Sequence, residues 1–146
     1  MKRIAYWIGL PVLALSMGAL PGCDSAEEDG TIRNTDFVAT AAFSHSADVT
    51  DQTMMRVDGI NGTVVLRAEP NVSSVVITGE KRVGSESLSD ATEYLQRLNV
   101  IVTQTDDEIV ARTEQPGDSD GREFIVDYDI TVPADLEVDI NHVNGV

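Results

Sequence analysis

Beyond residue 34, apolar and polar residues alternate along most of the chain, which is the pattern of half-buried β-strands. The clearest case covers residues 123–132, where every second residue is apolar and most of the others are charged or polar. Pro133 ends this strand. The residues expected on its core face are Phe124, Val126, Tyr128, Ile130 and Val132. Further strands are predicted at 37–43, 55–58, 63–67, 74–82, 99–104, 108–113 and 136–140.

One segment has a helical period instead. Its apolar positions recur three or four residues apart, at Leu88, Ala91, Leu95 and Leu98. This spacing predicts an amphipathic helix of about three turns, capped at its start by Ser87 or Ser89 and packed on a sheet. The fold class expected for residues 35–146 is therefore mainly β, a solenoid-like or sandwich-like domain with one short amphipathic helix.

A short sequence occurs twice near predicted strand ends. Residues 57–62 resemble residues 140–145, and the two Asn-Gly pairs, Asn61-Gly62 and Asn144-Gly145, lie 83 residues apart. Asn-Gly is a strong turn signal because both residues tolerate positive φ. An apolar residue, Asn, Gly and a second apolar residue also form the corners of β-solenoids, which normally need at least three repeats. Chance recurrence of so short a motif is the alternative.

The N-terminus has the composition of an export signal. Lys2 and Arg3 precede an uncharged apolar run over residues 4–20, and small residues follow. The run is short for a membrane span, which needs ~20 apolar residues. We therefore predict export across a bacterial membrane.

The end of this signal resembles the bacterial lipobox at Leu20, Gly22 and Cys23. The resemblance implies that the signal peptide, residues 1–22, is removed and that lipid is attached to Cys23. Lipid at this position would anchor the protein to a membrane of the cell envelope. The alternatives are an uncleaved anchor and a secreted protein with an unmodified thiol.

Charge is distributed very unevenly. All 25 acidic residues lie at or after Asp24, and removal of the signal changes the formal net charge from −15 to −17. Such a field repels nucleic acid, so binding to nucleic acid is excluded. Residues 23–34 are polar and acidic without periodicity, and we expect a flexible tether there.

Catalytic motifs are missing from the sequence. Cys23 is the single cysteine, so no intramolecular disulfide can form, and His45 and His142 do not have the spacing of zinc ligands. Residues 117–121 resemble a calcium loop only superficially, because Pro116 occupies the place of the first acidic ligand. We therefore predict no cofactor, no metal site and no enzymatic activity. A hydrolase built on strand carboxylates is disfavoured because no nucleophile, base or metal cluster matches them.

The order of the predicted elements resembles a bacterial family of adhesin-type domains of unknown function. The resemblance rests on these segments: the strand and Asn-Gly turn at 57–65, the strand at 75–82, the acidic helix at 87–98, the hairpin at 100–112, the Val-x-Tyr-x-Ile-x-Val-Pro strand at 126–133 and the strand at 136–145. It implies a lipid-anchored, non-enzymatic envelope protein that presents its β domain for adhesion or scaffolding. The family continues into β-helix rungs, so we expect this domain to be incomplete at its C-terminus. The alternative function is an envelope-stress or signalling accessory that binds a membrane protein.

The last predicted strand has no successor to pair with. Residues 136–140 alternate as a strand, and Asn144-Gly145 then signals a turn that only Val146 follows. An unpaired edge exposes free N–H and C=O groups that recruit other chains. We therefore expect self-association through this edge, or a partner strand from an envelope protein or surface ligand.

Overall fold

The computed structural model of the 146-residue chain describes residues 35–145. The predicted signal peptide (1–22), the predicted tether (23–34) and Cys23 lie outside the described residues. The elements in order are β1 (Phe37–Asp48), β2 (Met54–Gly62), β3 (Val64–Glu69), β4 (Ser74–Ser85), α1 (Leu88–Leu95), β5 (Asn99–Gln104), β6 (Glu108–Glu114), β7 (Glu123–Pro133) and β8 (Glu137–Gly145).

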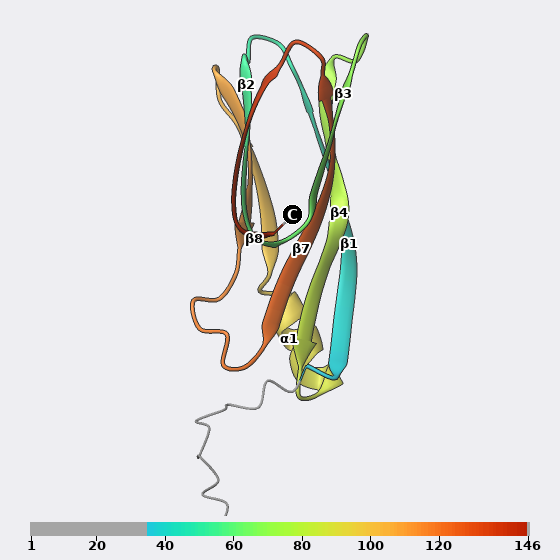
Figure 1. Ribbon diagram of the computed structural model, residues 1–146, viewed down its shortest axis with the longest axis vertical. Helices are drawn as coiled ribbons and strands as arrows, with labels where there is room; N and C mark the ends of the chain where they lie inside the picture. Colours follow the sequence, from blue (N-terminus) through green and yellow to red (C-terminus); the bar gives the residue numbers. More distant parts are fainter. Residues whose placement is uncertain (1–34, 146) are drawn as a thin grey trace, which may run out of the picture.

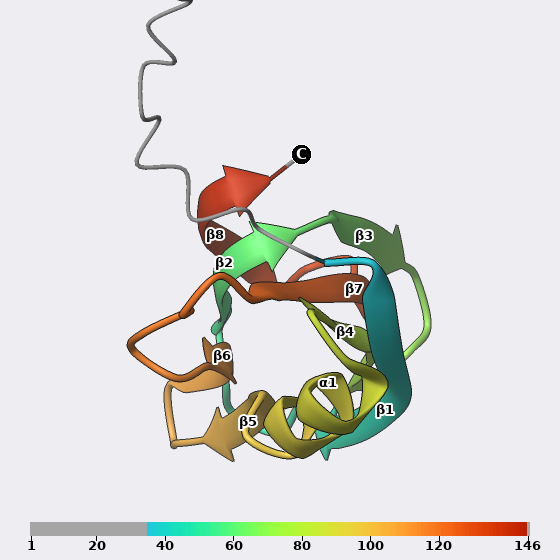
Figure 2. The same ribbon diagram turned by 90° about the horizontal axis from the view of Figure 1, so that it is seen from below.

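The strands form two four-stranded sheets that enclose one core (Figure 1, Figure 2). One sheet has the order β1-β4-β7-β3 and the other has the order β5-β6-β2-β8. Both are mixed: β6, β2 and β8 run parallel side by side, as do β7 and β3, whereas β1–β4, β4–β7 and β5–β6 are antiparallel. The expectation of a mainly β, sandwich-like domain with one short helix is confirmed.

The core follows the alternation in the sequence most closely on β7. Its five predicted core residues are all at most 2% exposed, which confirms the predicted core face of this strand. They meet buried residues of the second sheet, among them Met55, Val57 and Ile109. The one polar atom on this face, the hydroxyl of Tyr128, lies 2.6 Å from the hydroxyl of Thr113, so its burial leaves no hydrogen bond unmade.

The helix α1 is shorter than the three turns expected from the leucine spacing. Ser87 is its N-cap, and the Ser87 side chain accepts a hydrogen bond from the backbone N–H of Asp90. The helix ends at Leu95, after eight residues. Leu98 is fully buried, but it lies beyond the helix because the chain must extend at residue 99 to pair β5 with β6. Seen along the long axis, α1 lies between β1 and β5 (Figure 2).

Candidate functional site

The repeated sequence corresponds to two neighbouring strands. β2 and β8 pair in parallel, and every residue of β2 lies beside the residue 83 positions later in β8, including Asn61 with Asn144 and Gly62 with Gly145. Stacking of the two copies therefore replaces chance recurrence as the explanation of the repeat. In Figure 1 the chain crosses from β2 to β3 next to the C-terminal end of β8.

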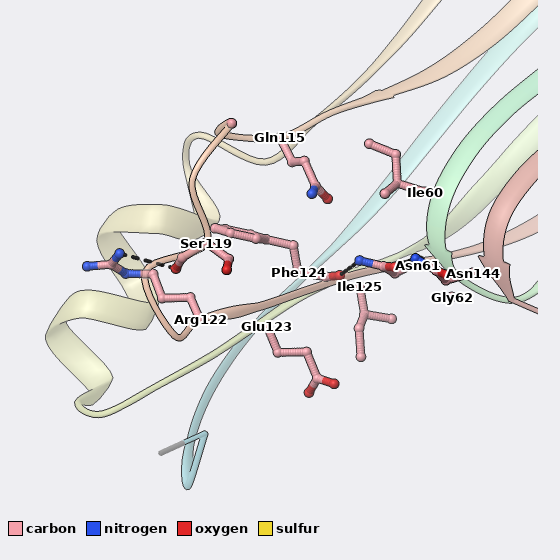
Figure 3. Close-up of a pocket in the computed structure, with 11 residues that line it drawn as sticks. Ile60, Asn61, Gly62, Gln115, Ser119, Arg122, Glu123, Phe124, Ile125 and Asn144 are labelled. Carbon is pink, nitrogen blue, oxygen red and sulfur yellow. Dashed lines mark hydrogen bonds between the residues drawn. The ribbon is translucent and has the colours of Figure 1, made fainter. Parts of the chain in front are cut away.

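The two asparagines form a short ladder of side-chain amides (Figure 3). Nδ2 of Asn144 donates to Oδ1 of Asn61 over 3.0 Å, and Nδ2 of Asn61 donates to the carbonyl of Phe124 over 3.1 Å. Each amide thus donates toward β7 and accepts from the opposite side. The side-chain oxygen of Asn144, at the outer end, accepts no hydrogen bond from any residue between 35 and 145.

Residues 61–63, which we call the corner, carry the chain from one sheet to the other. Gly62 has φ of 129°, and a Cβ there would lie 2.2 Å from the carbonyl oxygen of Val126, so only glycine fits. The N–H of Thr63 donates to Oδ1 of Asp127 over 2.8 Å, and the Thr63 carbonyl accepts from the N–H of Tyr128 over 2.7 Å. The corner therefore satisfies the edge of β7 just before β3 begins to pair with it at Tyr128.

The two copies differ at one position where their packing is complementary. Gly59 in β2 lies beside His142 in β8, and a Cβ on Gly59 would lie 2.2 Å from Nδ1 of that imidazole. Nε2 of His142 donates to the carbonyl of Gly62 over 3.1 Å. The glycine makes room for the ring, and the ring holds β8 against the corner.

The outer sides of β8 and β3, which we call the open edge, are not paired with any strand of the described residues. Each strand is the last in its sheet. The open edge has exposed apolar side chains on both strands: Ile140 is 43% and Val143 is 69% exposed on β8, and Val65 and Leu66 are 40% and 37% exposed on β3. The strand edge expected at the C-terminal end is therefore present.

A cavity of about 580 Å³ adjoins the corner (Figure 3). Ile60, Asn61 and Asn144 line one side of it, and the loop between β6 and β7 lines the other with Gln115 and Ser119. The polar groups contributed by these residues are neutral amides and a hydroxyl, which are suited to hydrogen bonding and not to acid–base catalysis.

Arg122 also lines this cavity, but its guanidinium is engaged elsewhere. Nε and Nη2 bind the two carboxylate oxygens of Asp90 on α1 at 2.6 and 2.9 Å, and the group stacks on the Tyr94 ring at 3.6 Å. The hydrogen bonds from Arg122 and from the hydroxyl of Ser85 lower the pKa of the Asp90 carboxyl from its ordinary 3.8 to about 2. This ion pair ties the loop to the helix and has a structural role.

The remaining polar residues considered from the sequence do not gather into a site. His45 and His142 lie on β1 and β8, at the edges of different sheets. Asp120, in the loop once compared with a calcium site, lies 3.4 Å from the guanidinium of Arg122. Across residues 35–145, no three His, Cys, Asp or Glu side chains are grouped so that they could hold a metal ion.

No family model matches the chain, and neither the curated proteins nor the solved structures contain a match to it. The resemblance to adhesin-type domains stays a hypothesis. Within the described part of the chain, no helix is long and apolar enough to cross a membrane.

Sequence reasoning identified the ladder residues only as turn signals. The spacing of 83 residues between the two Asn-Gly pairs was the signal that the strands are neighbours, because a constant offset along two segments is what parallel pairing in register requires. The cavity and the Asp90–Arg122 pair left no comparable trace in the sequence.

Proposed function

We propose that this chain is a lipid-anchored, non-enzymatic protein of the bacterial cell envelope whose β domain is a scaffold that a segment of another polypeptide joins at the open edge. The observation that carries the proposal is the in-register stack of β2 and β8, which ends at an amide acceptor, Asn144, that has no donor among the described residues. A β-stack of this kind extends by the addition of one more strand.

Anchoring is supported by the N-terminal sequence. Lys2, Arg3, the apolar run and the lipobox-like residues ending at Cys23 have the order of a lipoprotein signal. Lipid at Cys23 would hold the domain at a membrane, and the acidic residues 24–29 would keep the following segment in water. The domain would then face partners within the envelope.

Scaffolding is supported by the chemistry of the open edge. Strand addition uses backbone hydrogen bonds for affinity and side-chain contacts for specificity, and it needs no catalytic group. The exposed Ile140 and Val143 supply apolar area next to the free backbone of β8. Adhesion to a surface ligand, as the family resemblance implies, would be one use of the same edge.

The experiment is site-specific photocrosslinking of the full chain in a bacterial envelope. A photoreactive amino acid at Asn141, which is exposed on β8, is compared with one at Thr103, which is exposed on β5 at the other end of the same sheet. We expect a discrete crosslinked polypeptide from position 141 that position 103 does not give. Equal products from both positions, or none from position 141, would overturn the proposal.

A further inference from the structure

We propose that the segment that joins β8 is a strand–turn–strand of the same type as residues 54–69, with an Asn-Gly pair stacked on Asn144-Gly145 and a basic residue five positions before that Asn. This inference rests on the proposed function and names the chemistry of its partner. The partner belongs to a different protein and not to a second copy of this chain.

The asparagine requirement follows from the direction of the ladder. Asn144 has already used its Nδ2 to donate to Asn61, so what it offers outward is a carbonyl oxygen. A side-chain amide one strand further out repeats the same geometry, because parallel strands place equivalent residues at one spacing. Leu at this position would cover the oxygen without supplying a donor, which is costly for a polar group removed from water.

The basic residue follows from the residues that already lie beside β8. Arg56 of β2 lies beside Asp139 in the parallel register, and its guanidinium also binds Glu108 at 3.2 Å and Asp58 at 3.6 Å. Asp139 and Glu137 are exposed on the outer strand. A joining strand with a basic residue at the level of Asp139 would complement these carboxylates.

The same charges disfavour a second copy as the partner. If β8 of one copy paired in register with β8 of another, Asp139 would lie beside Asp139 and Glu137 beside Glu137, and like charges at paired positions are destabilising. The formal charge of −17 expected after signal removal adds a general repulsion between copies. Self-association is therefore the less favourable use of this edge.

The second arm of the partner follows from the corner. After Gly62 the chain turns from β2 into β3, whose Val65 and Leu66 are exposed. A joining segment that turned in the same way after its own Asn-Gly would lie along β3 and cover these two side chains. Apolar residues are therefore expected two to four positions after its glycine.

The test uses the full chain in detergent micelles and a synthetic peptide with the sequence of residues 54–69. Hydrogen exchange measured by mass spectrometry reports protection of β8, and fluorescence anisotropy of the labelled peptide reports affinity. We expect the peptide to slow exchange in β8 but not in β5. Peptides with Asn61→Leu or Arg56→Glu should each bind about tenfold more weakly, the effect of losing one polar contact.

Variants of the protein separate the ladder from general edge binding. Asn144→Leu should weaken the unmodified peptide about tenfold, and it should abolish the difference between that peptide and its Asn61→Leu form. Asn141→Leu is the matched control: it is an exposed asparagine on the same strand outside the ladder, and it should bind the peptide as the native chain does.

Two results would overturn the inference. Protection of β8 by all peptides alike would show edge binding without the asparagine and arginine preference. Protection of β8 that rises with protein concentration alone would make a second copy the partner. Absence of any peptide binding while position 141 still crosslinks a partner refutes this inference but not the proposed function, whereas loss of that crosslink refutes the proposed function.

Discussion

Asn144 donates from its side-chain amide to the side-chain oxygen of Asn61 over 3.0 Å, although 83 residues separate them in the chain. Asn61 passes the contact on to the backbone of β7, because its own Nδ2 binds the carbonyl of Phe124. One amide pair therefore connects both sheets, and it does so where β2 ends and the chain crosses to β3. The connection makes the corner the part of the molecule most sensitive to small changes.

Replacement of Asn61 should destabilise the fold. Asn61→Leu removes the donor to Phe124 and the acceptor for Asn144, so we expect a loss of ~1–3 kcal/mol in the free energy of unfolding. Urea denaturation followed by circular dichroism measures it. Asn141→Leu, on the exposed face of β8, should change stability by less than ~0.5 kcal/mol. Equal stability of Asn61→Leu and the native chain would show that the ladder contributes nothing.

Gly62 should not tolerate a side chain. In Gly62→Ala the new Cβ would lie 2.2 Å from the Val126 carbonyl oxygen, in a backbone conformation with φ of 129° that alanine disfavours. We expect destabilisation of more than ~1 kcal/mol in urea denaturation. Gly117→Ala is the control, because a Cβ there meets nothing within 4 Å. The prediction is wrong if the two variants unfold at the same urea concentration.

The Asp90–Arg122 pair should make stability depend on acidic pH. The pKa of Asp90 is lowered from 3.8 to about 2 in the folded chain, so the stabilisation is complete above pH 3.8 and is lost as the pH falls toward 2. We therefore expect Asp90→Asn to lower the melting temperature at neutral pH and to lose this deficit near pH 2.

The matched control for this pair is Glu93→Gln. Glu93 binds Arg97 on the same helix, but both side chains are more than half exposed, so removal of the pair should have little effect. A melting-temperature deficit of Asp90→Asn that stays constant from pH 7 to pH 2 would contradict the assignment of the lowered pKa to this ion pair.

Lipidation at Cys23 is a separate prediction that rests on the sequence. Cys23→Ala should move the protein out of the membrane fraction or stop removal of residues 1–22, because the thiol is the expected site of attachment. Cell fractionation and mass spectrometry of the native protein measure both effects. An unmodified thiol in the native protein, or retention of the first 22 residues, would refute the lipoprotein hypothesis.

Local features of the fold could be predicted because they depend on neighbouring residues. The period of two from Phe124 to Val132 predicted the buried face of β7, since a strand exposes alternate side chains to opposite sides. Ser87 predicted the start of α1, since a cap acts within one turn. The mainly β class follows from repeating such patterns along the chain.

The arrangement of these elements was decided by the tertiary structure. Alternation indicates which face of a strand is buried but not which strand lies beside it, so the parallel order β6-β2-β8 was not predictable from pattern alone. The end of α1 at Leu95 depends on the pairing of β5 with β6, and the link between Asp90 and Arg122 joins residues 32 positions apart. The repeat that includes Asn61 and Asn144 is the exception, because in-register parallel pairing holds the offset between two strands constant, and a constant offset can be seen in the sequence.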